Sequence, residues 1–300
     1  MFMDCFRRRQ DGSALILSIL ILGIMFWAVI SLAFFARQML NVSNRQERSF
    51  ESDLVFLAGV NHVREIFKAD ETPETDSIDD PWMGEVEIPR SWQEALIVTA
   101  ADEESKLNLN WSSQPALTYM IKYLSKAHGL EYSAEDLAEA IIAYRTKKLF
   151  DIVEEILLIK GIRRQDIEIF KEYFTAAPIY QVNINTAKEP VLKALIDTTA
   201  ASSYIKESLL RALFACRNSG RRISKNELTA QALVSLWHLE NTPGMLMALN
   251  QLIAYTTTDS QVLSLEMIYR KTYKASVIFQ PLAADNRKDI IFWHETRIAA

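Results

Sequence analysis

The chain is poor in the residues that build catalytic and cofactor-binding loops. It has 8 glycines, 8 prolines, 2 cysteines and 4 histidines among 300 residues. So few glycines argue against loops that cradle phosphate, and no P-loop, G-x-G-x-x-G or G-x-S-x-G pattern occurs. The histidines form no H-E-x-x-H pattern and are scattered along the chain, at His62, His128, His238 and His294. The sequence therefore predicts no catalytic residues, no cofactor site and no enzyme.

Cysteine and positive charge are also scarce. Cys5 precedes the first apolar run and Cys216 is then alone, so no internal disulfide is expected, and Cys216 is predicted to be a buried small residue. The formal net charge is −5, and residues 1–12 contain three arginines and two aspartates, so the rest of the chain carries −6. Such an acidic chain is a poor candidate for binding nucleic acid through bulk electrostatics.

Charged residues are absent from residues 13–36, which form a long apolar run. At about 1.5 Å per residue, a helix of this length spans roughly 36 Å and can cross a hydrocarbon core of about 30 Å. Three arginines, Arg7 to Arg9, precede the run. The positive-inside rule therefore predicts a single-pass protein in the lipid bilayer, with a cytoplasmic N-terminus and an exported C-terminal part.

A cleaved secretory signal is the alternative for such a start. Its apolar core is about 7–15 residues long and ends in a small-x-small site, whereas this run is longer and ends in poor cleavage sites. A short basic leader that ends in Gly12 and is followed by Ser13-Ala-Leu-Ile-Leu is instead similar to pilin leaders, whose apolar helix is retained. We expect residues 1–12 to be the leader and cleavage to fall between Gly12 and Ser13.

The apolar helix is predicted to continue through residues 37–69. Phe56, Val60, Val63 and Phe67 recur at helical spacing and mark one buried face. Residues 70–80 then interrupt the pattern with six acidic side chains and a proline, which is typical of a solvated loop. A calcium site would require several oxygen ligands to converge on one ion, and spacing alone does not show this.

Strand patterns lie on both sides of a helical region. Residues 96–99 and 107–110 alternate, and residues 102–105 between them suit a tight hairpin turn. Strand alternation returns in residues 261–298, with three predicted strands and a turn at residues 285–288. The fold class is therefore α+β, with a long N-terminal helix packed on a small antiparallel sheet and a helical domain inserted between strands. The sheet domain is assigned to residues 70–110 and 258–300, and the insert to residues 111–257.

The insert is predicted to contain about seven short helices between residues 112 and 255. Helix-end signals are spread along it: Gly129 as a stop, Ser133 as a cap, the capping boxes Thr186/Glu189 and Ser224/Glu227, and Thr242 before Pro243. Residues 153–174 and 182–192 have the pattern of helix-hairpin-helix elements, which in some proteins contact DNA phosphates. The first has a single glycine at its turn and the second has none, and acidic side chains surround the basic ones. We expect both elements to be structural.

Several segments together resemble one protein family, the K-type minor pseudopilin of bacterial type II secretion systems, or general secretion pathway protein K. They are the leader ending in Gly12, D-E-E-S-K-L-N-L-N at 102–110, E-I-L-L-I-K-G at 155–161, V-N-I-N-T-A at 182–187, and the closing W-H-E at 293–295. Ser105 stands where the family usually has glycine. The matches are spread over nearly the whole chain and keep the family's order.

This resemblance implies a non-enzymatic subunit of the inner membrane with a periplasmic C-terminal domain, capping the tip of a pseudopilus. Its implied partners are other minor pseudopilins, the prepilin peptidase and the inner-membrane assembly platform. Most pilin-like proteins carry glutamate at the fifth mature position to neutralise a neighbour's amine. Here that position is Leu17, as in K-type subunits, which fits a tip subunit with no neighbour above it. The family's acidic D-W-x-D-x-D segment is replaced by residues 143–148, so its calcium site is not carried over and no cofactor is expected.

Two other functions stay open at this point. One is an exported nucleic-acid-binding protein of a DNA-uptake apparatus that uses the hairpins. The other is a tip minor pilin of a type IV pilus.

Overall fold

A computed structural model describes residues 3–93, 95–282 and 289–298, with the side chains of the first helix described from Ala14 onward except at residues 45, 48 and 49. Two compact units, Met1–Val55 and Phe56–Ala300, make up the chain and are described separately. The turn predicted at residues 285–288 lies outside the described residues.

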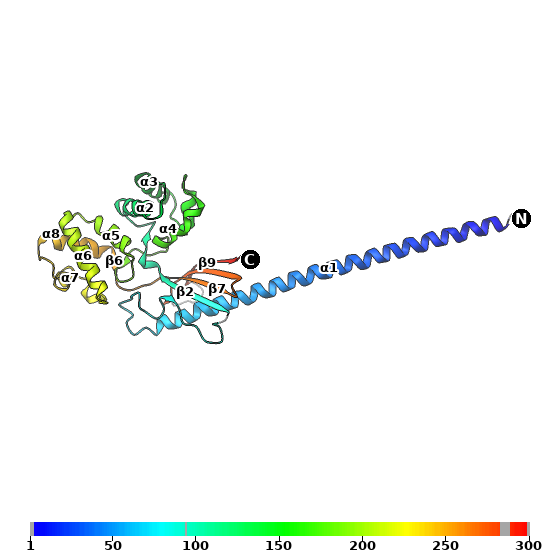
Figure 1. The fold of residues 1–300 in the computed structure, drawn as a ribbon, viewed down its shortest axis with the longest axis horizontal. Helices are drawn as coiled ribbons and strands as arrows, with labels where there is room; N and C mark the ends of the chain where they lie inside the picture. The colour runs from blue at the N-terminus through cyan, green and yellow to red at the C-terminus, as the bar shows by residue number, and fades with distance from the viewer. Residues whose placement is uncertain (1–2, 94, 283–288, 299–300) are drawn as a thin grey trace. The chain divides into compact units, whose positions relative to one another are not determined.

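Helices and strands follow one another in the order drawn in Figure 1. The α-helices are α1 (Met3–Lys68), α2 (Gln114–His128), α3 (Ala134–Arg145), α4 (Ile167–Tyr173), α5 (Glu189–Asp197), α6 (Ser203–Asn218), α7 (Ala230–Leu236) and α8 (Pro243–Ala254). The strands are β1 (Gly84–Glu85), β2 (Leu96–Asp102), β3 (Leu107–Asn108), β4 (Phe174–Thr175), β5 (Val182–Asn183), β6 (Thr256–Thr257), β7 (Leu263–Tyr269), β8 (Tyr273–Phe279) and β9 (Ile290–Arg297). The 3-10 helices are η1 (Glu103–Ser105), η2 (Val153–Leu158), η3 (Arg164–Asp166) and η4 (Lys225–Glu227).

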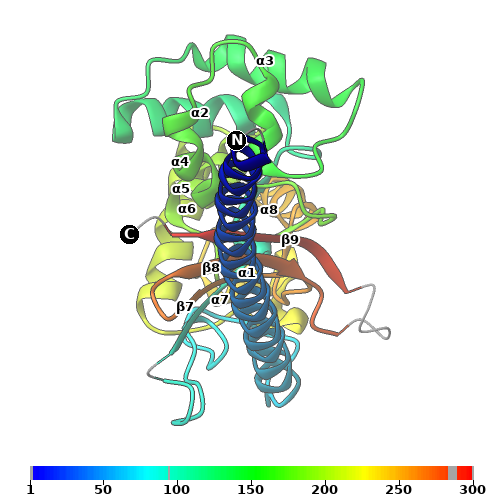
Figure 2. The ribbon, with the colours of Figure 1, turned by 90° about the vertical axis from the view of Figure 1, so that its right-hand side faces the viewer.

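The main sheet has five antiparallel strands in the order β1-β2-β7-β8-β9. Figure 2 shows β7, β8 and β9 lying side by side. Along β7 the odd-numbered residues are buried, as the alternation in the sequence predicts for a sheet with one covered face. Because β2 is followed in the sheet by β7, the 160 residues between them leave the sheet and return to it.

The C-terminal part of α1 covers the buried face of this sheet. Phe56, Val60 and Val63 are fully buried, which confirms the predicted helical face. Phe56 meets Tyr269 of β7 edge to face, with ring centroids 6.4 Å apart. Gly59 lies so close to β7 that an added Cβ would stand 2.8 Å from the Sδ atom of Met267. Glycine at this position therefore permits the close approach of helix and sheet.

Seven α-helices, α2–α8, form a separate helical block of residues 114–254 (Figure 1). They share one hydrophobic cluster that extends from Leu107 to Leu252, and Cys216 is buried in it as expected. The caps predicted at Ser133 and Thr242 are present.

The capping box predicted at Thr186 and Glu189 is wrong. Lys188 precedes α5 without a side-chain cap, because the Thr186 hydroxyl donates its hydrogen bond to Asp102 instead. The first helix expected in each hairpin is also absent as an α-helix, since η2 precedes Gly161 and β5 opens the second segment.

The helical block and its flanking strands contain one arrangement twice, and each copy begins with an Asn-x-Asn triplet. In the first copy, the Asn108 side chain accepts a hydrogen bond from the Asn110 N–H at 2.7 Å. Asn110 then exchanges two hydrogen bonds with the backbone of Phe150, at 2.9 and 2.8 Å. This copy ends where β4 pairs with β3 in parallel.

The second copy repeats these contacts with the triplet at residues 183–185. Asn183 accepts from the Asn185 N–H at 2.9 Å, and Asn185 exchanges two hydrogen bonds of 2.9 Å with the backbone of Ile223. It ends where β6 pairs with β5, again in parallel. Residues 107–175 and 182–257 are therefore two structural repeats, and each triplet joins the start of a repeat to its middle.

The hairpin predicted between residues 96–99 and 107–110 is wrong. Strand β2 pairs with β1 and β7, whereas β3 pairs with β4 of the first repeat. The polar residues expected to form a tight turn form η1, which leads the chain out of the sheet. The α+β fold class is confirmed, with the long N-terminal helix, the antiparallel sheet and the helical insertion between its strands.

Candidate functional site

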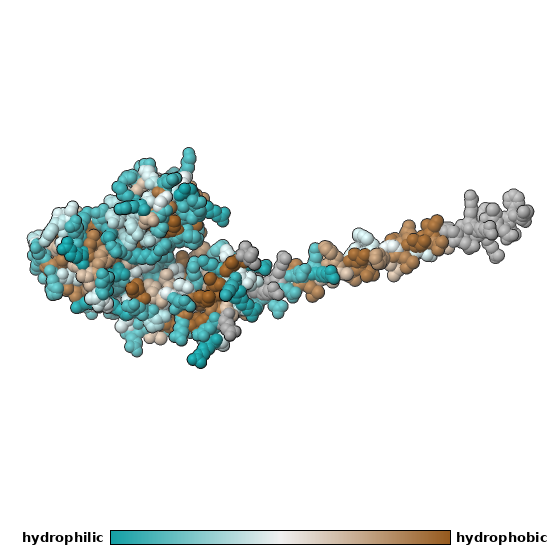
Figure 3. Space-filling view, viewed as in Figure 1, coloured by the Kyte–Doolittle hydropathy of each residue, from teal (hydrophilic) through white to brown (hydrophobic). Residues whose placement is uncertain are grey.

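The first functional feature is the exposed apolar segment of α1. Residues 14–44 have a mean hydropathy of 2.7 over their most apolar window, and none of that window is buried. Figure 3 shows apolar side chains exposed along this part of the helix. By length and composition it is the one helix among the described residues that could anchor the chain in a membrane.

Leu17 lies on this segment with 59% of its surface exposed. Gly12 and Ser13 lie within the backbone of α1, and the side chain of Ser13 is outside the described part. Nothing in the fold tests the cleavage between them or the role of Leu17, so both stay predictions.

The second feature is a group of buried acidic residues where the main sheet meets the two repeats. We call it the acidic junction, and it consists of Asp76, Asp80, Asp102, Glu103 and Glu104, which are all at most 4% exposed. Buried carboxylates require hydrogen bonds or opposite charges. Their partners therefore show what the junction holds together.

Asp102 and Glu103 connect η1 to both repeats. The Thr186 hydroxyl, just after the second Asn-x-Asn triplet, donates to Asp102. The Thr175 hydroxyl at the end of the first repeat donates to Glu103, which also pairs with Lys106 at 2.5 Å. Burial raises the pKa of Asp102, whereas for Glu103 the charge of Lys106 and the hydrogen bonds outweigh burial and lower the pKa.

Glu104 holds the start of β7. Its two carboxylate oxygens accept from the N–H groups of Gln261 at 3.0 Å and Val262 at 3.2 Å. Burial, and after it the charge of Asp102, raise the pKa of Glu104 well above its ordinary value. The D-E-E triplet of the sequence motif is thus a structural clamp between the sheet and the repeats, which explains why three acids stand at this turn.

The other two junction residues come from the loop between α1 and β1. This loop was predicted to be solvated, which is wrong for Asp76 and Asp80, because they are 1% and 4% exposed. The Asp76 carboxylate accepts from the Ser260 N–H, and its own N–H donates to the Thr258 carbonyl at 2.8 Å. Asp80 accepts from the Ser77 N–H at 2.6 Å and pairs with Arg222 of the second repeat at 2.8 Å.

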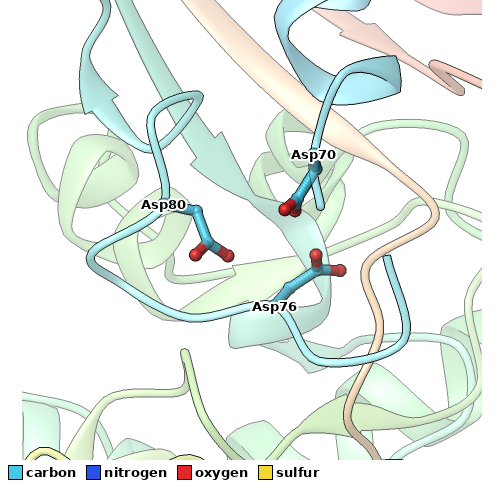
Figure 4. Close-up of side chains that lie close together, drawn as sticks. All are labelled: Asp70, Asp76 and Asp80. Carbon is cyan, nitrogen blue, oxygen red and sulfur yellow. The ribbon is translucent and has the colours of Figure 1, made fainter. Parts of the chain in front are cut away.

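Asp70 joins these two residues in an aspartate cluster, which we define as Asp70, Asp76 and Asp80. One carboxylate oxygen from each lies within 4.8 Å of the others. Figure 4 shows their carboxyl groups turned to a common space. Burial, and after it the charges of Asp102 and Asp80, raise the pKa of Asp76 to about 7, against a hydrogen bond from Ser260 that lowers it. In the described part of the chain this is the one group of three or more such side chains placed to hold a metal ion.

Residues 143–148, which stand where the resemblance in sequence would place an acidic segment, carry basic side chains. Arg145 ends α3 and donates to the Leu109 carbonyl at 2.9 Å. Lys148 pairs with Asp151 and Glu155 at 2.8 and 2.7 Å. Basic side chains thus occupy this place and neutralise the nearby acids.

Comparison with known proteins places the fold. No protein-family model matches the chain, and no curated protein matches it. Among solved structures, it is similar to a chain of the GspK-GspI-GspJ complex from the enterotoxigenic Escherichia coli Type 2 Secretion System. The TM-score is 0.54 at 14% identity, and the match covers 86% of this chain and 99% of that chain. The chain therefore has a type II secretion pseudopilin-like fold.

Proposed function

We propose that this protein is a K-type minor pseudopilin, which caps the tip of a type II secretion pseudopilus and supports protein export across the outer membrane. The observation that carries the proposal is the fold shared with a chain of the GspK-GspI-GspJ complex. The match covers 86% of this chain, and residues 114–254 are about half of it, so most of the helical block is included. The likeness thus extends beyond a helix packed on a sheet, to the insertion that distinguishes this chain.

The exposed apolar part of α1 supports the membrane stage of this function. It would hold the protein in the bacterial inner membrane with its N-terminus in the cytoplasm and its head in the periplasm. Prepilin peptidase would remove residues 1–12 at Gly12, and the assembly platform would then move the retained helix out of the bilayer into the filament.

Leu17 supports a place at the filament end. A glutamate at this position would have to meet an amine from a neighbouring subunit, because an unpaired carboxylate inside packed apolar helices is costly. Leucine is uncharged and needs no such partner. A tip subunit can therefore join the helix bundle without a partner above it.

We assign the protein no enzyme activity and no nucleic-acid partner. Four acids of the junction already bond to the chain that surrounds them: Asp102, Glu103 and Glu104 through hydrogen bonds, and Asp80 through its pair with Arg222 of the second repeat. Their arrangement holds the sheet and the repeats in one head, which other minor pseudopilins would contact.

Deletion of the gene followed by a secretion assay tests the proposal. We expect exported substrates to accumulate in the periplasm and the full-length chain to restore their secretion. Unchanged secretion would refute the type II assignment, and a defect confined to surface pili would favour the type IV pilus alternative.

A further inference from the structure

The aspartate cluster contains a buried oxygen without a partner. Asp76 is 1% exposed, and only one of its carboxylate oxygens accepts a hydrogen bond, from the Ser260 N–H. Its Oδ1 atom is buried and receives none, and the Oδ2 atom of Asp70 is in the same state. Buried polar atoms are almost always bonded in folded proteins, so two such oxygens in one cluster call for a ligand.

The charges around the cluster leave a deficit of positive charge. Three carboxylates face the common space, and Arg222 is the cation that pairs with one of them, Asp80. If all three are ionised, the balance is two negative charges. Asp102 lies near enough to act on Asp76 with a charge of the same sign.

We propose that Asp70, Asp76 and Asp80 bind a divalent cation, and that the cation is Ca²⁺. Ca²⁺ takes about six to eight oxygen ligands in flexible geometry, and protein carboxylates commonly supply several of them. Mg²⁺ requires near-ideal octahedral geometry and is usually held by only one or two carboxylates. Three carboxylates that converge on one space therefore suit Ca²⁺ better than Mg²⁺.

This site is separate from the position at which the resemblance would place calcium. That position is occupied by residues 143–148 at the end of α3, whereas the cluster lies in the loop after α1. The inference also stands apart from the proposed function, because it rests on these carboxylates alone.

A bound ion would connect three parts of the head. Asp70 follows the end of α1, Asp76 holds the chain that enters β7 through Ser260, and Asp80 contacts the second repeat through Arg222. The ion would therefore fix the end of the long helix to the sheet and to the helical block. Its removal should loosen the whole junction.

Calcium titration of the full-length protein in detergent, after removal of metal with a chelator, tests the proposal. We expect Ca²⁺ near 1 mM, a level that extracellular calcium modules bind, to raise the melting temperature, with a smaller effect of Mg²⁺ at the same concentration. Asp76→Asn should weaken Ca²⁺ binding by about tenfold or more, because a charged ligand is lost. Asp79→Asn is the matched control, since Asp79 is exposed in the same loop and outside the cluster.

Equal Ca²⁺ affinity in the wild type and Asp76→Asn, or no calorimetric binding to the wild type, would overturn the site. If Asp76→Asn does not fold, the Ca²⁺ affinity of Asp70→Asn decides, because Asp70 is only partly buried and its substitution should disturb folding less. Equal affinity for Mg²⁺ would overturn the assignment to calcium. Loss of binding in Asp79→Asn to the same degree would overturn the choice of ligands.

Discussion

The ion pair between Arg64 and Asp289 offers a sharp test of how α1 is held on the sheet. Arg64 extends from the buried face of α1, and Asp289 directly precedes the edge strand β9. Their side chains are 5% and 0% exposed. Arg64 also donates to Asn61 at 2.6 Å and lies over the ring of Phe279, 5.7 Å from its centroid. Water therefore cannot replace a lost partner.

Removal of one partner should be far more costly than removal of both. Asp289→Ala leaves the guanidinium of Arg64 buried without its counter-charge, a loss of about 3–5 kcal/mol. At about 2–4 °C per kcal/mol, the melting temperature should fall by about 6–20 °C. The double variant Arg64→Met/Asp289→Leu fills the same space with apolar groups and should recover most of this loss, because the desolvation penalty of both charges disappears.

Thermal unfolding of the full-length protein in detergent, followed by circular dichroism, measures these effects. Glu266→Ala is the matched control, because it breaks an exposed pair with Lys274 on the same sheet and should cost about 0–1 kcal/mol. A drop for Asp289→Ala no larger than that of the control would refute the reasoning. So would a double variant that is less stable than the single one.

Four further predictions follow from the sequence and the junction. N-terminal sequencing should find Ser13 as the first residue of the mature protein, and a bulky residue in place of Gly12 should leave the leader attached. Anisotropy titration at about 150 mM salt should detect no binding to duplex DNA, even with dissociation constants in the roughly 10⁻⁴–10⁻⁶ M range of non-specific binders. Submicromolar, salt-sensitive binding would restore the alternative of a nucleic-acid-binding protein of a DNA-uptake apparatus. Leu17→Glu, compared with Leu17→Met, should keep normal membrane levels with unchanged or reduced secretion, and improved secretion would contradict the tip assignment. The pKa of Glu104 is raised in the folded state, so protonation of Glu104 stabilises the fold, and this stabilisation is lost as the pH rises from the unfolded-state pKa through the folded-state pKa. The melting temperature should therefore fall from pH 5 to 8. Glu104→Gln should reduce that fall.

Local patterns in the sequence correctly predicted the helices and strands that bury a single face. The alternation along β7 and the helical spacing of Phe56, Val60 and Val63 both follow from contact with a single apolar layer. The same holds for most helices of the insert, since α2, α3, α6, α7 and α8 each follow a Ser or Thr whose side chain caps the helix. The domain boundaries themselves stay predictions.

Sequence patterns led to wrong predictions where a polar side chain forms a hydrogen bond with a residue far along the chain. Thr186 looked like a helix cap, but its hydroxyl donates to Asp102, which is 84 positions away. Asp76 looked solvated, but it bonds to Ser260, 184 positions away. No local pattern encodes such pairs, so the burial of the acidic junction could be found only in three dimensions. The two Asn-x-Asn triplets were visible as motif fragments, yet their shared role became clear only from their contacts.

Co-purification tests the central claim most directly. The full-length chain, tagged at its C-terminus, would be expressed with the other minor pseudopilins of its own secretion system and extracted from membranes in detergent. The account predicts a stable complex that contains the other minor pseudopilins and one copy of this chain. If those subunits assemble equally well without it while the chain elutes alone, it is not a minor pseudopilin of the tip.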